Sequence, residues 1–480
     1  MSDRRAEGRL WEHPILTFRR PKAITFTFDG RPIRAYEGET IAAALHAAGI
    51  RVLSRTRSGA PRGLFCAIGK CSSCLATVDG IPNVRTCVTP VGEGMAVESQ
   101  RGPGRLNPGF CPRDREVREV RAEAVVVGAG PAGLSAARTL LRHGVKPLVF
   151  DENPHLGGQL IKQTHKFFGS RAERAGTRGY TIAEELLAEV AGEAEVLRRA
   201  RVLGLYFEDG RRVLAIAHLD RLLLVETEDL IVATGAEERF LLFPGNYLPG
   251  VYGAGAVQTL MNVYGVVPGE RALMVGAGNV GLIVSYQLLQ AGVEVAAVVE
   301  AMPEIGGYHV HAAKIRRLGV PILTRHTVVR ALGEERVEGA VIAEVDGDLS
   351  PVPGTERELE VDLVCLAIGL NPSTRLLEQA GARMAYVPEL GGRVPLHTPY
   401  METTLPGVYV AGDCAGIGEA STAMLEGELA ALSLLSRRGH DLGAETGAAR
   451  KSLEKLRLGP FGARPRAGKE KVFALMEGGA

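Results

Sequence analysis

The sequence predicts an α/β protein in which a small cysteine-containing domain precedes two Rossmann-type nucleotide-binding domains. Two observations predict this order. Four of the seven cysteines fall between residues 66 and 87, and two glycine-rich turns, GAGPAG and GAGNVG, each follow an apolar run farther along the chain. At 480 residues, the chain is long enough for two or three domains that each bury a core of their own.

The composition excludes some partners and locations. The 56 lysine and arginine residues nearly balance the 55 aspartate and glutamate residues, and no basic block stands out that would neutralise phosphates. We therefore expect no nucleic acid partner. No apolar run reaches membrane-spanning length, and the N-terminal stretch MSDRRAEGRLWEHP lacks the apolar core of a signal peptide. We therefore expect no transmembrane segment and a cytoplasmic location, where cysteines stay reduced.

Residues 1–112 are predicted to form the N-terminal domain. AITFTFDGRPIRAY is typical of a hairpin that turns at Asp29–Gly30, and EGETIAAALHAAGI is typical of a short helix that ends at Gly49. LATVDGIPNVRTC predicts a second hairpin with Asp79–Gly80 as its turn. Hairpin, helix, cysteine loop and hairpin, in this order, resemble a β-grasp, ferredoxin-like domain.

The cysteine spacing predicts a set of cluster ligands. The pattern C-x4-C-x2-C-x12-C, whose first three positions match plant-type [2Fe–2S] sites, is formed by Cys66, Cys71, Cys74 and Cys87. Two irons need four converging thiolates, and Gly63 and Gly69 would let backbone N–H groups turn toward the sulfurs. We predict a [2Fe–2S] cluster, with structural zinc and a loop without metal as the alternatives.

The other three cysteines are isolated in the sequence. Cys365 lies in the apolar stretch VDLVCLAI, where a buried cysteine is most often a small hydrophobic filler. Cys414 follows a glycine–aspartate turn and is also expected to serve packing. Cys111 lies in a polar connector and could face the cluster, although four ligands already suffice.

The first glycine-rich turn predicts a discontinuous Rossmann domain over residues 113–240 and 370–440. An apolar strand leads into Gly128-x-Gly130-x-x-Gly133 and a helix, and the next strand ends at Asp151. Such glycines permit a tight turn and the close approach of a pyrophosphate to a helix N-terminus, and the acid can bind a ribose hydroxyl. The cofactor-binding residues predicted here are Gly128, Ala129, Gly130, Pro131, Ala132, Gly133, Asp151, Glu152, Asn153, Gly158, Gln159, Val202, Ala233, Thr234 and Gly235.

The same unit repeats in residues 241–369, which we predict to form an inserted second Rossmann domain. ALMVGAGNVG carries Gly276, Gly278 and Gly281, and the following strand ends at Glu300. An acid at this position repels a 2′-phosphate and so favours NAD over NADP, whereas the motif by itself leaves the occupancy of this site open. IVATGAEER and LVCLAIGLNP are predicted to carry the chain into and out of this domain.

A third segment, TTLPGVYVAGDCAGIGEASTAMLEGELAA, places Gly412–Asp413 between a predicted strand and a predicted helix. With the cysteine loop and the two glycine turns, residues 20–440 resemble the α subunit of multimeric flavin-dependent amine and imino-acid dehydrogenases. This family includes hydrogen cyanide synthase, opine oxidase, archaeal-type proline dehydrogenase and heterotetrameric sarcosine oxidase. The resemblance implies that Gly412 and Asp413 contact the ribityl and phosphate groups of a flavin.

The resemblance also implies a heteromeric complex. A β subunit of amine-oxidase fold would carry an FAD that takes the hydride from the substrate C–N bond. The present chain would pass electrons singly, through [2Fe–2S], to a one-electron acceptor or the respiratory chain. Its first nucleotide site would hold FAD, NAD or ATP, its second could hold NAD, and FMN could lie at a subunit interface. Proline, sarcosine, glycine and opines are the candidate substrates.

No catalytic residue of this chain is assigned. No Ser-His-Asp, paired-carboxylate or metal-hydrolase arrangement is recognisable, so proton abstraction from the substrate falls to the partner. Residues 441–480 are predicted to form a C-terminal tail without cysteines. Two further hypotheses remain: a self-contained NAD(P)H-dependent FAD/[2Fe–2S] oxidoreductase, and a non-catalytic assembly subunit whose nucleotide is structural.

Overall fold

The computed structural model describes residues 8–105, 116–170, 174–208, 211–459 and 462–478, and the chain forms two compact units. Unit 1 consists of Met1–Cys111 and Glu238–Gly369, and unit 2 of Pro112–Glu237 and Leu370–Ala480. The N-terminal and inserted parts thus share one unit. Cys111 and the boundary at residues 112–113 lie outside the described residues, and the finer division into four parts stays a prediction.

The N-terminal part of unit 1 is a five-stranded mixed sheet with one helix, α1 (Ile41–Ala47). The strands are β1 (Ala23–Phe28), β2 (Arg31–Tyr36), β5 (Leu75–Val78), β6 (Ile81–Arg85) and β7 (Ala96–Glu98), and a small second sheet holds β3 (Ser54–Arg55), β4 (Pro61–Arg62) and β8 (Gln100–Arg101). The sheet order is β2-β1-β7-β5-β6. Both predicted hairpins are confirmed, because Asp29–Gly30 and Asp79–Gly80 adopt the positive φ angles that such turns require.

The inserted part of unit 1 contains a five-stranded parallel sheet and a three-stranded antiparallel sheet. Its elements are β16 (Val251–Gly253), β17 (Arg271–Val275), β18 (Glu294–Glu300), β19 (Ile322–Thr324), β20 (His326–Leu332), β21 (Gly339–Glu344), β22 (Arg357–Leu359), β23 (Leu363–Leu366), α4 (Ala254–Gln258), the π-helix η2 (Thr259–Val263), α5 (Asn279–Gln290) and α6 (His309–Arg317). The parallel order is β16-β23-β17-β18-β19. Parallel strands need crossover connections, which the helices of βαβ units provide. The parallel sheet therefore agrees with the βαβ repeat predicted for this part of the chain.

One hydrophobic core runs through both parts of unit 1. Phe26 and Leu45 of the N-terminal part are completely buried in the same apolar cluster as Met274 of β17. In addition, His46 Nε2 of α1 lies 3.1 Å from the Tyr252 hydroxyl of β16. Burial lowers the pKa of His46, which keeps this contact between neutral groups. The N-terminal and inserted parts therefore stabilise each other through apolar burial.

Unit 2 is built on a seven-stranded sheet. Its strands are β9 (Val117–Val127), β10 (Pro147–Phe150), β11 (Glu195–Leu197), β12 (Ala200–Glu208), β13 (Arg211–His218), β14 (Arg221–Val232) and β27 (Val408–Val410). Strands β11, β10, β9, β14 and β27 are parallel, whereas β12, β13 and β14 form an antiparallel meander. The last residues of β14 lie between β9 and β27, so the carboxyl ends of these three strands are neighbours.

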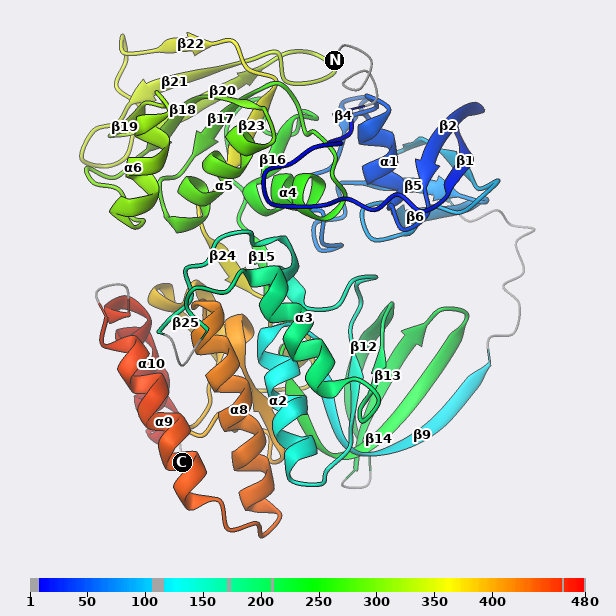
Figure 1. Cartoon of the computed structure of the whole chain (residues 1–480), viewed down its shortest axis with the longest axis vertical. Helices are drawn as coiled ribbons and strands as arrows, with labels where there is room; N and C mark the ends of the chain where they lie inside the picture. The colour runs from blue at the N-terminus through cyan, green and yellow to red at the C-terminus, as the bar shows by residue number, and fades with distance from the viewer. Residues whose placement is uncertain (1–7, 106–115, 171–173, 209–210, 460–461, 479–480) are drawn as a thin grey trace. The chain divides into compact units, whose positions relative to one another are not determined.

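Helices cover this sheet, and Figure 1 shows α2 (Pro131–Arg142) running alongside α8 (Ala420–Arg437). The segment predicted as a C-terminal tail is helical, forming α9 (Gly443–Arg457) and α10 (Ala463–Glu477). The remaining elements are α3 (Gly179–Val190), α7 (Arg375–Gln379), η1 (Gly158–Lys162), η3 (Pro388–Leu390), η4 (Gly412–Ala415), and the strand pairs β15 (Ala236–Glu238) with β24 (Leu370–Pro372) and β25 (Met384–Val387) with β26 (Gly392–Pro395). No helix within the described ranges has the length and apolarity needed to cross a membrane.

Candidate cofactor sites

The hairpin β5–β6 brings the fourth predicted cluster ligand to the other three. Leu75 pairs with Arg85, so Cys74 and Thr86, one position outside this pair, lie opposite each other. The Thr86 hydroxyl donates to the Cys74 carbonyl at 2.7 Å and fixes this register. Cys87 follows directly, and its thiol contacts two of the other cysteines. The sequence predicted this delivery from the turn signal at residues 79–80.

The loop that carries the first three cysteines directs backbone amides toward sulfur. The N–H of Cys71 donates to Cys66 Sγ at 3.4 Å, and the N–H of Ser73 donates to Cys71 Sγ at 3.5 Å. Gly69, with a φ of +73°, permits the left-handed turn between the first two cysteines. Such amide contacts stabilise negative charge on sulfur, as a cluster site requires.

Gly63 was expected to let backbone N–H groups turn toward the sulfurs, but the structure gives it a packing role. A Cβ at this position would lie 2.6 Å from the Arg51 carbonyl oxygen and 3.0 Å from Pro249 Cβ. Its φ is not among the positive values of the chain. Gly63 therefore permits close packing within unit 1, whereas Gly69 permits the turn beside the sulfurs.

The four thiols are linked in series by hydrogen bonds: Cys71 contacts Cys66, Cys66 contacts Cys87, and Cys87 contacts Cys74. The hydrogen bond from Cys71 lowers the pKa of Cys66 and raises that of Cys71. The hydrogen bond from Cys87 lowers the pKa of Cys74, and the contacts with Cys66 and Cys74 raise the pKa of Cys87. Because burial opposes ionisation of thiols, all four can be thiolates together only beside neutralising cations.

This donor set fits a two-iron cluster. Cys66, Cys74 and Cys87 are buried and Cys71 is partly exposed, so the sulfurs are shielded from bulk water. Four cysteine thiolates are the ligands that [2Fe–2S] clusters take. Within the described ranges, no three His, Cys, Asp or Glu side chains gather around a position for a single metal ion.

The first glycine turn lies between β9 and α2 in unit 2. Gly128 has a φ of +106°, and a Cβ there would lie 2.2 Å from the Ala233 carbonyl oxygen. A Cβ at Gly133 would lie 1.8 Å from the Gly128 carbonyl oxygen. By contrast, the atom nearest to a Cβ at Gly130, the N-cap of α2, is 3.7 Å away. The fold itself thus requires Gly128 and Gly133, whereas the backbone alone would accommodate a side chain at Gly130, in front of the helix N-terminus.

Asp151 is fixed against this glycine turn. Its Oδ2 accepts from the N–H of Ala129 at 2.8 Å, and its Oδ1 accepts from the backbone and side-chain amides of Asn153 at 2.8 and 3.0 Å. Burial raises the pKa of Asp151, and these amide contacts oppose the shift. The neighbouring Glu152 instead forms an ion pair with Arg201 of β12 at 3.0 Å. Asp151 is therefore the acid placed beside the turn.

The neighbouring strand ends carry further predicted residues. After β14, the N–H of Ala233 donates to the Val127 carbonyl at 2.8 Å, and the Thr234 hydroxyl donates to the Ser373 carbonyl at 2.6 Å. The other predicted residues lie as follows: Pro131 and Ala132 in the first turn of α2, Gly158 and Gln159 in η1, Gly235 after β14, and Val202 beside a register shift in β12.

The Gly412–Asp413 turn follows β27 in the same unit. Gly412 has a φ of +75°, and a Cβ there would lie 3.0 Å from Ala132 Cβ, next to the start of α2. The Asp413 carboxylate accepts from the N–H of Gly418 at 3.1 Å. Burial raises the pKa of Asp413 to about 6. The structure thus gathers the first glycine turn, Asp151 and this turn at one edge of the sheet.

The second glycine turn repeats the first in unit 1. Gly276 has the same φ of +106°, and a Cβ at Gly281 would lie 2.0 Å from the Gly276 carbonyl oxygen. A Cβ at Gly278, the N-cap of α5, would meet no atom within 4 Å. Glu300 Oε2 accepts from the N–H of Ala277 at 2.8 Å, which matches the contact between Asp151 and the first turn.

Glu426 is a residue that the sequence interpretation did not single out. It is buried on α8, where its Oε2 accepts from the N–H of Gly412 at 2.8 Å. The available signal was a glutamate directly after the apolar Met424–Leu425, on a predicted helix. Lys469 of α10, which contacts Glu426, gave no such signal, because it lies in the basic stretch RPRAGKEK.

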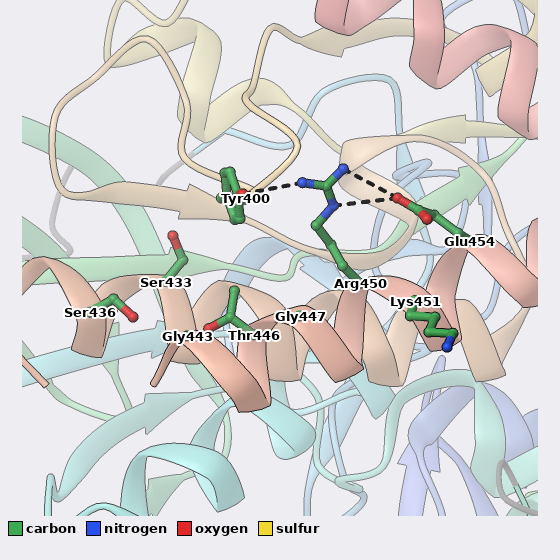
Figure 2. Close-up of a pocket in the computed structure, with 9 residues that line it drawn as sticks. All are labelled: Tyr400, Ser433, Ser436, Gly443, Thr446, Gly447, Arg450, Lys451 and Glu454. Atoms are coloured by element: carbon green, nitrogen blue, oxygen red, sulfur yellow. Dashed lines mark hydrogen bonds and ion pairs between the residues drawn. The ribbon is translucent and has the colours of Figure 1, made fainter. Parts of the chain in front are cut away.

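Unit 2 also has a cavity of about 620 Å³ that none of the predicted cofactor residues lines. Figure 2 shows Arg450 in its wall, with Nη1 donating to the Tyr400 hydroxyl at 3.1 Å and Nε and Nη2 facing Glu454. The cavity is lined by Tyr400, Ser433, Ser436, Gly443, Thr446, Gly447, Arg450, Lys451 and Glu454. The Arg450 charge is already neutralised by Glu454, so we assign the cavity no role.

Family models match both the nucleotide-binding region and the N-terminal cysteine-containing region. Residues 122–427 match the pyridine nucleotide-disulphide oxidoreductase model, and residues 21–102 match the 2Fe-2S iron-sulfur cluster binding domain. These matches confirm the predicted fold class, and they support the binding of a flavin or nucleotide and of a [2Fe–2S] cluster.

The chain is also similar to subunits of amine-oxidising enzymes. The alpha subunit of sarcosine oxidase from Corynebacterium sp. (strain P-1) is 28% identical over 440 residues, covering 87% of this chain and 44% of the relative. An opine oxidase subunit from Rhizobium meliloti (strain 1021) is 31% identical over 352 residues, covering 67% and 72%. The chain thus spans less than half the length of the sarcosine oxidase subunits that it matches.

Among solved structures, L-proline dehydrogenase from P. horikoshii shares the fold, with a TM-score of 0.72 and 24% identity over 92% of this chain and 79% of that one. The chain accordingly belongs to the pyridine nucleotide-disulphide oxidoreductase family and carries an N-terminal 2Fe-2S domain.

Proposed function

We propose that this chain is the electron-transfer, flavin- and nucleotide-binding α subunit of a heteromeric FAD-dependent amine or imino-acid dehydrogenase. One observation carries the proposal: a four-thiol loop that suits [2Fe–2S] and two glycine turns with open N-caps occur in one chain. Flavins exchange electron pairs with substrates, whereas iron–sulfur clusters transfer single electrons. A chain with both sites can therefore link amine oxidation to a one-electron acceptor or the respiratory chain.

We assign FAD to the first site. The open N-cap at Gly130 would admit the pyrophosphate, Asp151 would bind ribose, and the turn at Gly412–Asp413 would approach the flavin side of the cofactor. NAD and ATP share the ADP moiety that such a turn recognises, so identification of the nucleotide released from the purified chain tests this assignment. FAD supports it, and ATP or NAD overturns it.

We assign the substrate pocket to a partner subunit. The matched sarcosine and opine oxidases are named as subunits, and this chain spans only part of the former. The proposed partner has an amine-oxidase fold with its own FAD, FMN is proposed at the interface, and the substrate is proline, sarcosine, glycine or an opine. We also propose a cytoplasmic location for the complex.

The second nucleotide site favours one competing function, that of a self-contained NADH-dependent oxidoreductase. Gly278 leaves the N-cap of α5 open, and Glu300, which accepts from the N–H of Ala277, would bind the ribose of NAD. Anaerobic mixing with NADH decides between the two functions. We expect no bleaching of the flavin by NADH in the isolated chain, and reduction of its cluster by an amine only with the partner present. Rapid bleaching by NADH would instead support the self-contained enzyme.

A further inference from the structure

The C-terminal helix α10 contributes a buried lysine to unit 2. The side chain of Lys469 is only 4% exposed. Its Nζ lies 3.0 Å from Glu426 Oε1, 3.1 Å from the Ala415 carbonyl oxygen and 3.2 Å from His397 Nε2. Burial lowers the pKa of His397 to about 3, so this ring is neutral and can accept from the ammonium. All three contacts of Lys469 Nζ are thus hydrogen-bond acceptors.

These contacts lead directly to the turn after β27. The Ala415 carbonyl belongs to η4, which begins at Gly412. Glu426, the second partner of Lys469, accepts from the Gly412 N–H through its other oxygen, Oε2, at 2.8 Å. Both ends of η4 are therefore linked to one ammonium group, one end directly and the other through Glu426.

The charges around the turn are balanced. Glu426 also accepts from Arg457 of α9, whose Nη2 lies 2.5 Å from Oε1. Nearby, burial and the negative charge of Glu426 raise the pKa of Asp413, whereas the positive charge of Lys469 lowers it. Two cations and two carboxylates thus come together in a dry region. Removing Lys469 would leave an excess of negative charge beside Asp413.

We infer that Lys469 is a positioning residue, which holds the Gly412–Ala415 turn in shape through Glu426 and the Ala415 carbonyl, and keeps Asp413 ionised for its ligand. The second half of this inference rests on the proposed function, in which the turn contacts a flavin. The first half concerns only the residues of this chain. The C-terminal helices thereby become part of the cofactor site.

Lys471 offers a matched control on the same helix. It is exposed and pairs with Glu389 at the surface. Hydrogen–deuterium exchange of the full-length chain, without added nucleotide, is compared for Lys469→Met and Lys471→Met. We expect the amides of residues 412–418 to exchange about fivefold or more faster in Lys469→Met, because loss of one hydrogen bond weakens local protection by that order. The Lys471→Met chain should match the wild type.

A second variant separates charge from packing. Lys469→Gln keeps a hydrogen-bond donor, on a side chain that is one bond shorter, but it removes the charge that favours ionised Asp413. We measure FAD affinity from pH 5 to 8. Loss of a nearby cation should raise the pH below which affinity falls by about one unit or more in Lys469→Gln. A merely structural lysine would weaken binding equally at every pH.

The outcomes separate this inference from the proposed function. If exchange at residues 412–418 is unchanged in both Lys469 variants, the positioning role is wrong, whether or not the chain binds FAD. If exchange rises in Lys469→Met and the wild type binds no FAD, the positioning role stands and the flavin assignment fails. If FAD binds with the same pH profile in wild type and Lys469→Gln, the effect on Asp413 is refuted.

Discussion

Gly130→Ala is the substitution that most clearly separates folding from nucleotide binding at the first site. Gly130 has a φ of −85°, which alanine adopts freely, and its Cβ would meet no atom nearer than 3.7 Å. We therefore expect the free energy of unfolding to fall by less than about 1 kcal/mol, the usual cost of alanine at an N-cap. Gly133→Ala is the contrasting variant, because its Cβ would lie 1.8 Å from a carbonyl oxygen. That overlap should cost about 3 kcal/mol or more.

Unlike stability, the affinity of Gly130→Ala for FAD should fall strongly. The added methyl of Gly130→Ala would occupy the space in which a pyrophosphate approaches α2. An overpacking cost of about 1–3 kcal/mol corresponds to a roughly 5- to 150-fold weaker affinity for FAD. The assay combines thermal unfolding of the nucleotide-free chain with fluorescence titration of FAD. Unchanged FAD affinity in a stable Gly130→Ala chain would refute the assignment of the pyrophosphate to this turn.

Three further expectations follow from other contacts. Cys74→Ala should abolish bound iron. Cys365→Ala, at a buried position of β23 that is not a predicted ligand, should keep it, and iron analysis after anaerobic purification distinguishes the two variants. Arg9→Met should lower the free energy of unfolding in urea by about 3 kcal/mol, because it leaves the buried Glu39 carboxylate without the arginine that binds both of its oxygens. Arg55→Met removes an exposed ion pair and should leave the urea midpoint unchanged. Equal midpoints for both arginine variants would contradict this. Burial raises the pKa of Asp413 from 3.8 to about 6. The folded chain therefore holds this proton more tightly than the unfolded chain, and the stability that this gives below pH 4 is lost as the pH rises through about 6. Without nucleotide, Asp413→Asn should therefore gain up to about 3 kcal/mol over the wild type between pH 4 and 7, as followed by urea unfolding, and parallel pH curves would show the shift to be absent.

The elements with strong local signals were predictable from the sequence. Asp29–Gly30 and Asp79–Gly80 specify tight turns, and the strand–glycine–helix pattern around Gly128 and Gly276 specifies the βαβ units. These patterns are local because a left-handed backbone or a close backbone approach restricts the residue at that position. They also placed the four cysteines on the loop and the hairpin that the structure shows.

Long-range packing was not predictable in the same way. The shared core of the N-terminal and inserted parts depends on apolar residues far apart in sequence, such as Leu45 and Met274, and such residues fit any core. Lys469 resembles a solvent-exposed lysine in a basic helix, and only the fold reveals that Glu426 faces it. A buried ion pair leaves no local pattern, because its partners are set by tertiary structure.

The proposed function depends on a cluster and a flavin that exchange electrons, and one measurement tests this most directly. The chain is purified without oxygen, its iron and acid-labile sulfide are quantified, and electron paramagnetic resonance spectra are recorded before and after reduction. We expect two irons and two sulfides per chain, and a one-electron signal after reduction that Cys74→Ala removes. Zinc bound among these thiols, or a metal-free chain with intact flavin, would contradict the proposed function.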